Sequence, residues 1–431
     1  MSDDDAAVGW GDPSNLSRYN SPYYKETHRA WRRTLRAWVE EKLAPHVRDW
    51  EKTKVIPREV FRDAFRVGFL PAIVGAPWPE LAGPCPVLGG AKAFDAFHEL
   101  IAWEEISRCG SGGLAWGICE GIQIGVPPLL NFASSELRDR IAPLCLRGEK
   151  VICLCISEPY AGSDVANIRC TAERKRVRNA QGVEEEVFVV NGEKKWITNG
   201  MYADYMLIAA RTGGKGNKGI SIILVETDRP GVDRKQMDCM GMWASGTAYI
   251  TLEDVHVPVS NLVGEENRGF YHIMYNFNHE RWGFIAMSTE FARVCLDEAT
   301  KYALKRRTFG KLLAEHPVIR AKIGEMARHI ESTHAMLELL TYQMTTMSKA
   351  EQMTKLAADS ALIKVQATKT FEYCAREAAQ ILGGNSYIRG GQGEKIERLY
   401  REVRACAIPG GSEEIMTDLA VRQILKPVKK L

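Results

Sequence analysis

The sequence has no apolar run long enough to span a membrane, no Cys-x-x-Cys pair and little net charge. Its 431 residues are 45% hydrophobic and 26% charged, with a net charge of +3. This composition is typical of a globular chain and argues against nucleic-acid binding as its main function, although a local basic patch could still hold a phosphate. The 11 cysteines are scattered, so we interpret them as reduced core thiols, not disulfides or metal ligands, in a reducing compartment.

Targeting signals are also missing. The acidic start Met-Ser-Asp-Asp-Asp has neither the apolar core of a signal peptide nor the arginines of a transit peptide. The final Lys429-Lys430-Leu431 is only loosely similar to the peroxisomal Ser-Lys-Leu address. We expect a cytoplasmic location in a bacterium and a mitochondrial or peroxisomal one in a eukaryote.

Hydrophobic periodicity divides the chain into four parts. Residues 1–24 are polar and predict a flexible or surface-draped lead. Residues 25–150 have helical periods, and the first helix has one apolar stripe and one basic stripe: Trp31, Leu35, Trp38, Val39 and Leu43, opposed by Arg32, Arg33 and Arg36. Residues 151–265 have short apolar runs separated by turns, and residues 266–431 return to a helical period. The predicted fold class is α+β: a helical domain, a small β-barrel or sandwich, and a helical bundle.

Two boundaries within this plan are specific. A helix should begin at Pro57 and carry Phe61, Ala64 and Phe65. Gly110–Ala115 matches a Gly-x-Gly-x-x-Ala dinucleotide fingerprint, but that motif requires a strand before it, and the preceding segment is helical in period. The sequence therefore argues against a Rossmann fold.

Two stretches of the β region are candidates for a ligand site. Residues 152–164, Ile-Cys-Leu-Cys-Ile-Ser-Glu-Pro-Tyr-Ala-Gly-Ser-Asp, pass from a strand into a loop of small and hydroxyl residues. Such a loop allows close approach of a planar or phosphorylated ligand, although an ordinary strand exit explains it equally well. In Val-Asn-Gly-Glu-Lys-Lys-Trp-Ile-Thr-Asn-Gly, residues 190–200, Asn191-Gly192 predicts a hairpin, with Trp196 and Thr198 on one face of the returning strand.

These motifs carry a family resemblance. Ser-Glu-Pro-x-Ala-Gly-Ser-Asp followed by Asn-Gly-x-Lys-x-Trp-Ile-Thr-Asn-Gly resembles the acyl-CoA dehydrogenase family, and three more motifs follow in order: Arg306-Arg-Thr-Phe-Gly310, Gln380-Ile-Leu-Gly-Gly384 and Gly410-Gly-Ser-Glu-Glu-Ile415. The resemblance implies an α–β–α fold, FAD, an acyl-CoA substrate, α,β-dehydrogenation to the trans-2-enoyl-CoA, an electron-transferring flavoprotein as acceptor, and a homotetramer built as a dimer of dimers. Fatty acid β-oxidation is the expected metabolic setting.

The resemblance also implies residues for cofactor and substrate. Ser157 and Ser163 would contact the flavin ring and diphosphate side, and Ser163 the substrate as well. Other implied FAD contacts, some of them to a neighbouring subunit's FAD, are Trp196, Thr198, Arg306, Thr308, Phe309, Gln380, Gly384, Ser412 and Glu414. Implied substrate contacts are Glu120, Asn278, Arg281 and the Gly410 N–H, which would donate to the thioester oxygen.

The catalytic base stands at an unusual position. Many family members have a Glu where this chain has Gly410, and glycine cannot abstract a proton. Glu280, with Arg281 beside it on an apolar helix face, resembles the base of the long-chain and isovaleryl branches and is the predicted catalytic residue, with a pKa raised by burial. Glu120-Gly121 instead resembles the floor of a medium-chain pocket; the alternative is a solvent-facing Glu120. A structural Glu280, an oxidase, or an inactive flavin-binding protein are the other hypotheses.

Overall fold

The computed structural model describes residues 7–16, 18–178 and 182–425, and these form two compact units. The first unit comprises residues 1–45, 95–112 and 278–431, and the second comprises 46–94 and 113–277. The long helix α9 (Gly269–Lys305) contributes residues to both. The predicted division at residues 24, 150 and 265 follows chain order and remains a prediction.

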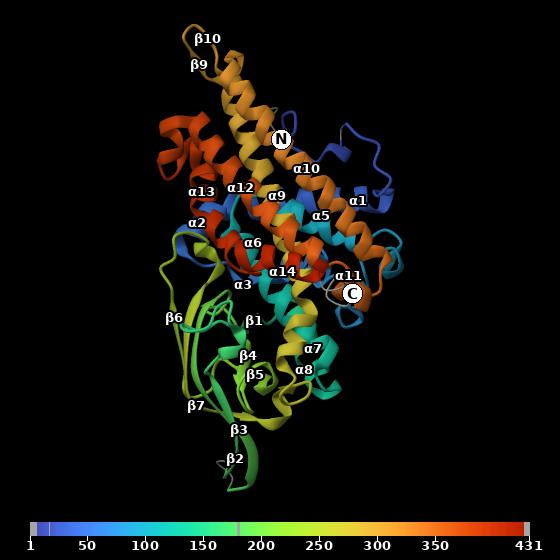
Figure 1. The fold of residues 1–431 in the computed structure, drawn as a ribbon, viewed down its shortest axis with the longest axis vertical. Coiled ribbons are helices and arrows are strands. Elements are labelled where there is room, and N and C mark those ends of the chain that lie inside the picture. Colours follow the sequence, from blue (N-terminus) through green and yellow to red (C-terminus); the bar gives the residue numbers. More distant parts are fainter. Residues whose placement is uncertain (1–6, 17, 179–181, 426–431) are drawn as a thin grey trace. The chain divides into compact units, whose positions relative to one another are not determined.

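The second unit contains an eight-stranded sheet of order β6-β7-β3-β2-β4-β5-β8, with β1 parallel to β4 (Figure 1). Its core includes Phe188, Met206 and Ile223, all fully buried. The predicted apolar runs thus become buried strands, as their lack of charge requires. The strands are β1 (Ile152–Cys155), β2 (Thr171–Arg178), β3 (Glu184–Ile197), β4 (Tyr205–Arg211), β5 (Ile220–Glu226), β6 (Val232–Gln236), β7 (Ala248–Pro258) and β8 (Leu262–Val263).

The predicted hairpin at Asn191-Gly192 is wrong, because both residues lie inside strand β3. The β3–β7 register shifts between Val190 and Gly192, which marks a β-bulge. Gly192 has a φ of +143°, and a Cβ on it would lie 2.7 Å from the Cα of Cys170. The glycine is therefore required by close backbone packing and not by a chain reversal.

Helices complete the second unit. Helix α3 follows Pro57 and carries Phe61, Ala64 and Phe65, as predicted. Phe61 and Ala64 are buried and Phe65 is half-buried. The segment before Gly110 is helix α5 (Ala96–Ser107), which confirms that the glycines there are not a dinucleotide fingerprint. The helices are α2 (Val47–Thr53), α3 (Arg58–Arg66), α4 (Phe69–Ile73), α6 (Gly112–Glu120), the π-helical turn η6 (Gly121–Gly125), α7 (Val126–Phe132) and α8 (Ser135–Leu146).

The first unit is a helical bundle in which α12 packs against α10, α13 and α14 (Figure 1). The helical period of residues 266–431 is confirmed by three long helices, α9, α10 and α12. The elements are α1 (Glu26–Trp38), α5, the 278–305 part of α9, β9 (Arg307–Thr308), β10 (Lys311–Leu312), α10 (Pro317–Thr346), α11 (Lys349–Lys355), α12 (Ala357–Leu382), α13 (Glu394–Ala407) and α14 (Glu413–Leu425). The fold class is therefore confirmed, with helices, then a sheet, then helices.

The apolar stripe of the first helix is buried as predicted, but its basic stripe is not all exposed. Arg32 is buried and pairs with Glu104 and Glu105 of α5. Arg36 pairs with Glu105 at 3.0 Å. Two acidic residues on a neighbouring helix thus convert a predicted surface arginine into a core residue, since a buried charge needs a partner.

The described part of the N-terminal lead contacts the bundle. The amide of Val8 donates to Asp297 at 2.8 Å, and Arg293 donates to the Trp10 carbonyl at 2.8 Å. Ser14 is buried and bonds to Glu331. Residues 8–14 therefore lie along α9 and α10 of their own unit.

All 11 cysteines are free, as the sequence predicts. Cys153 and Cys155 approach within 3.6 Å between sulfurs on β1 and are fully buried. Among the described residues, no helix is both long and apolar enough to cross a bilayer. The C-terminal Lys429-Lys430-Leu431 lies outside the described residues.

Candidate active site

Glu280 lies on α9 in the first unit, one turn before the buried Phe284. Burial raises the pKa of its carboxyl to about 7, although the positive charges of Arg281 and Lys364 oppose the shift. No described residue donates a hydrogen bond to this carboxylate. A partly buried, unengaged carboxylate with a pKa near neutrality has the properties of a general base.

The predicted substrate-side residues of this unit surround Glu280. Arg281 donates from Nε to the Gly410 carbonyl at 3.1 Å and from Nη1 to Asn278 Oδ1 at 3.1 Å. Asn278 donates in turn to the Gln352 carbonyl at 3.3 Å. The structure therefore brings Asn278, Glu280, Arg281 and Gly410 together, with the arginine and the asparagine held by protein groups.

Gly410 occupies a position that no other residue fits without strain. Its φ is +67°, and a Cβ on it would lie 3.0 Å from the Phe284 ring. The next residue, Gly411, also has a positive φ, of +99°. Within the described residues, neither glycine N–H donates to a protein acceptor. A glutamate here would therefore be strained by the backbone and crowded by Phe284, while two amide donors remain available.

The predicted flavin loop of the second unit is built on an ion pair that our sequence analysis missed. Lys194 Nζ lies 2.7 Å from Glu158 Oε1, and both side chains are buried. Glu158 also accepts the amides of Arg169 at 2.6 Å and Cys170 at 3.0 Å, while Lys194 donates to the carbonyls of Ile156 and Ala209. This network fixes the loop that carries Ser157 and Ser163. The only sequence signal was the presence of both charges inside otherwise ligand-like motifs.

Trp196 and Thr198 do not lie on one face of a regular strand, as the sequence analysis predicted. Trp196 has a φ of +61° within a register shift between Lys194 and Ile197, and Thr198 lies beyond the end of β3. Simple strand alternation therefore does not place them. The bulge turns the indole outward, leaving Trp196 51% exposed.

Four predicted cofactor contacts of the second unit fit a flavin ring. The hydroxyls of Ser157, Ser163 and Thr198 bond to none of the described residues, and the Trp196 indole is exposed. Hydroxyl donors beside an exposed indole, over which Lys195 Nζ lies 4.7 Å from the ring centre, match the polar edge and flat face of an isoalloxazine ring. These four residues are the ones that would hold the ring.

The predicted FAD contacts of the first unit lie at the ends of α9 and α12. Arg306, Gln380 and Gly384 are exposed, and Thr308 bonds to His316 at 3.1 Å. Phe309, at the tip of the β9–β10 hairpin, is 95% exposed with a φ of +49°. An aromatic residue held outward in this way is suited to contact another molecule.

Ser412 and Glu414 stand at the start of α14. Ser412 Oγ accepts the Ile415 amide at 3.5 Å, and its hydroxyl helps to lower the pKa of the exposed Glu414 carboxyl. Both residues therefore take part in capping the helix, which is compatible with a second contact to a ligand.

Glu120 is only 5% exposed, so the solvent-facing alternative is wrong. It ends α6, at the start of the π-helical turn η6. π-Helical turns often occur at functional sites. Whether Glu120 borders an acyl chain remains a prediction.

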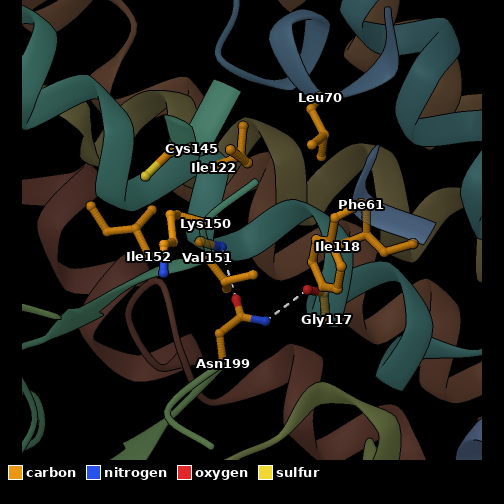
Figure 2. A pocket seen from close by; sticks show the side chains of 11 residues that line it. Phe61, Leu70, Gly117, Ile118, Ile122, Cys145, Lys150, Val151, Ile152 and Asn199 are labelled. Atoms are coloured by element: carbon orange, nitrogen blue, oxygen red, sulfur yellow. Dashed lines mark hydrogen bonds between the residues drawn. The ribbon is translucent and has the colours of Figure 1, made fainter. Parts of the chain in front are cut away.

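Asn199, which our sequence analysis also missed, attaches the end of the flavin motif to α6. Its amide donates to the Gly117 carbonyl at 2.7 Å and its Oδ1 accepts the Gly121 amide at 3.1 Å (Figure 2). A Cβ on Gly121 would lie 2.1 Å from the Ile152 carbonyl oxygen. The cavity beside them has about 10 Å³, enough for one water molecule and far too small for an acyl chain.

One triad lies at metal-ligand distances. Asp95 Oδ1 is 2.9 Å from both His28 Nε2 and His98 Nδ1 in the first unit. The other ring nitrogens bond to the Lys25 amide and the Thr27 hydroxyl. These hydrogen bonds, which cap α1 and α5, account for the arrangement without an ion.

Comparison with known proteins identifies the family. The acyl-CoA dehydrogenase N-terminal, middle and C-terminal domains match residues 25–149, 153–255 and 267–425. The chain is 38% identical to acyl-CoA dehydrogenase apdG of Emericella nidulans (98% of this chain, 97% of that one) and 38% identical to acyl-CoA dehydrogenase AFT10-1 of Alternaria alternata (99% and 98%). The crystal structure of an acyl-CoA dehydrogenase from Geobacillus kaustophilus superposes with a TM-score of 0.82 at 29% identity (94% and 100%). The chain therefore belongs to the acyl-CoA dehydrogenase family and is an FAD-dependent oxidoreductase that acts on acyl-CoA.

Proposed function

We propose that this enzyme converts a saturated acyl-CoA into its trans-2-enoyl-CoA with Glu280 as the base, and passes the electrons to an electron-transferring flavoprotein. The supporting observation is that two features occur together, one at Glu280 and one at Gly410. The first has a carboxyl pKa raised to about 7, and the second stands where the family resemblance puts the base of many members but has a backbone conformation that would strain any side chain.

The chain's own groups have defined tasks in this proposal. Glu280 removes the α-proton, for which the ionised form is needed at neutral pH. The unpaired amides of Gly410 and Gly411 donate to the thioester oxygen, where negative charge develops as the proton leaves. FAD, when bound, would supply the acceptor for the β-hydrogen, which leaves as hydride.

Arg281 and Asn278 orient these groups. Arg281 fixes the Gly410 carbonyl, and its charge lies beside Glu280, which favours the ionised base. Asn278 anchors the guanidinium from the same helix, one turn away. Their contribution is to hold the base and the amide donors in one arrangement before substrate binds.

The proposed assembly is a homotetramer in which FAD contacts residues of two chains. The support is the exposed Phe309 at the β9–β10 tip, near the exposed Arg306. The expected locations stated above and the role in fatty acid β-oxidation remain proposals that rest on the family resemblance.

Anaerobic titration of the purified flavoprotein with acyl-CoAs of increasing chain length tests the function. A saturated acyl-CoA should bleach the flavin absorbance of the wild type but not of Glu280→Gln, and the best substrate reports the chain length. Bleaching of both proteins at equal rates would remove Glu280 from the base role. Failure of every acyl-CoA to bleach the wild type would favour the inactive flavin-binding protein.

Transfer to the acceptor needs its own assay. The reduced enzyme should reoxidise faster with an electron-transferring flavoprotein than with dissolved oxygen. Faster reoxidation by oxygen, with hydrogen peroxide formed in equal amount, would identify an oxidase instead.

A further inference from the structure

Lys364 is a fully buried cation with no role in the mechanism so far. It lies on α12 and is 0% exposed. Its Nζ donates to the carbonyls of Ala407 at 2.7 Å and Gly411 at 2.9 Å. A buried ammonium group is costly, so its persistence in the core calls for a reason beyond packing.

The two carbonyls belong to residues 407–411, which form most of the connection between α13 and α14 and are called the 407–411 turn below. Arg281 holds the Gly410 carbonyl of the same turn. Two cations from two different helices, α9 and α12, therefore bind three carbonyls within five residues. Backbone groups bound in this way cannot rotate without losing a charge-assisted hydrogen bond.

Fixing the carbonyls also fixes the amides. In a trans peptide, the C=O of one residue and the N–H of the next point in opposite directions. Because Arg281 holds the Gly410 carbonyl, the Gly411 N–H points away from Arg281. Lys364 holds the carbonyls of Ala407 and of Gly411 itself, which belong to the 407–408 and 411–412 peptides. These peptides flank the segment whose two peptides carry the N–H groups of Gly410 and Gly411. Since both glycines have positive φ and glycine is flexible, the turn needs external restraints to keep this shape.

Lys364 is also linked to the base. Its Nζ lies 5.8 Å from the centre of the Phe284 ring, and that ring contacts Gly410. Lys364 acts electrostatically on Glu280, where its charge opposes the effect of burial. Burial lowers the pKa of Lys364 itself to about 8, against the influence of Cys406, Glu413 and Glu280 and with that of Arg281.

We propose, on the basis of the function proposed above, that Lys364 is a positioning residue for the thioester end of the site. It holds the 407–411 turn so that the Gly410 and Gly411 amides face the substrate oxygen, and its charge favours the ionised form of Glu280. It touches neither the substrate nor the reacting atoms.

Ligand binding separates this role from a general structural one. The flavin-loaded Lys364→Met protein should bind a trans-2-enoyl-CoA about tenfold more weakly than the wild type, measured by calorimetry, because the thioester oxygen loses its oriented donors. Binding of free CoA, which has no thioester oxygen, should change less than about twofold. Lys369→Met is the control for loss of a nearby positive charge alone: Lys369 lies on the same helix, is 61% exposed and has its Nζ 3.9 Å from Glu413, but among the described residues it donates to no carbonyl of the turn. It should change neither affinity.

Lys364→Gln separates the hydrogen bonds from the charge. Glutamine can still donate to one carbonyl, so enoyl-CoA binding should fall less than in Lys364→Met. Both variants lack the charge, so the pH at which the rate of flavin reduction is half-maximal should rise in both and stay unchanged in Lys369→Met. If Lys364→Met does not fold, the shifted pH profile of Lys364→Gln still tests the proposal.

Three results would overturn the proposal: equal loss of enoyl-CoA and CoA affinity, wild-type behaviour of both variants, or an unshifted pH profile in both. The wild-type titration distinguishes these from failure of the proposed function. If a saturated acyl-CoA reduces the wild-type flavin, the dehydrogenase function stands whatever Lys364 does. If none does, the dehydrogenase function fails first.

Discussion

Arg281 Nε donates to the carbonyl of Gly410 at 3.1 Å, joining residues 129 positions apart in the chain. The neighbour of the arginine is the candidate base, and the glycine is the position where the family resemblance puts the base of many members. One hydrogen bond therefore connects the helix of the candidate base with this second position. Most of the predictions below concern this connection or the loops that support it.

Glu280→Gln should reduce the rate of flavin reduction by an acyl-CoA about 10²- to 10⁴-fold, the usual contribution of a general base. Affinity for the enoyl-CoA product should change little, because the amide donors of the 407–411 turn remain. Stopped-flow absorbance measures the first and calorimetry the second. Glu372→Gln, at an exposed carboxylate on α12, is the control and should behave as the wild type.

The rate of flavin reduction should rise with pH and level off above about 7, because Glu280 must lose its proton to act. The residual rate of flavin reduction in Glu280→Gln should not show this rise with pH. A wild-type midpoint near 4.5, the ordinary carboxyl value, would show that burial does not tune the base.

The contribution of Glu280 to the free energy of unfolding should fall as pH rises, whereas the rate of flavin reduction rises. The pKa of its carboxyl is higher in the folded chain, so the fold binds this proton more tightly than the unfolded chain does. The associated stabilisation is lost as pH rises from 4.5 to about 7. Glu280→Gln should therefore gain in melting temperature relative to the wild type between pH 5.5 and pH 8. An unchanged difference across that range would contradict the raised pKa.

Gly410→Ala should destabilise the fold by about 1–3 kcal/mol, the usual cost of a strained backbone conformation. Its Cβ would also press on Phe284. Urea unfolding of Gly410→Ala, Phe284→Leu and the double variant measures the coupling. If the contact with the ring matters, the double variant should be less destabilised than the sum of the single ones.

Glu158→Gln should destabilise the second unit by about 3–5 kcal/mol, because it leaves the buried Lys194 without its counter-charge. FAD content of the purified protein should fall as well, since the loop with Ser157 and Ser163 loses its support. Glu351→Gln breaks an exposed pair with Lys355 and should cost about 0.5 kcal/mol or less. Normal FAD content in Glu158→Gln would mean that the loop does not depend on the pair.

The long helices and buried strands could be predicted because their evidence is local. The apolar stripe from Trp31 to Leu43 and the run Ile220–Val225 determine their elements within a few turns or residues of chain. The motif resemblance likewise assigned Glu280 and Gly410 to the thioester end of the substrate, and these roles remain predictions. These predictions needed no knowledge of which segments meet.

The features that the sequence did not predict depend on contacts between segments that are distant in the chain. Asn191-Gly192 has the local pattern of a turn, but Cys170 packs so closely against it that only a bulge with glycine fits. Arg32 is buried because Glu104 and Glu105 lie opposite on another helix. Lys364 gave no signal, since its partners are carbonyls, which every residue has.

The left-handed backbone at Gly410 has a consequence for how such enzymes can change by mutation. To move the base from α9 to the 407–411 turn, a lineage would need a glutamate at Gly410. The backbone there would strain any side chain, and Phe284 would crowd it. Replacing Glu280 first leaves no base, and replacing Gly410 first distorts the amide donors. The two base positions are thus separated by intermediates of low fitness, and single-step evolution should keep each branch of the family with the base it has.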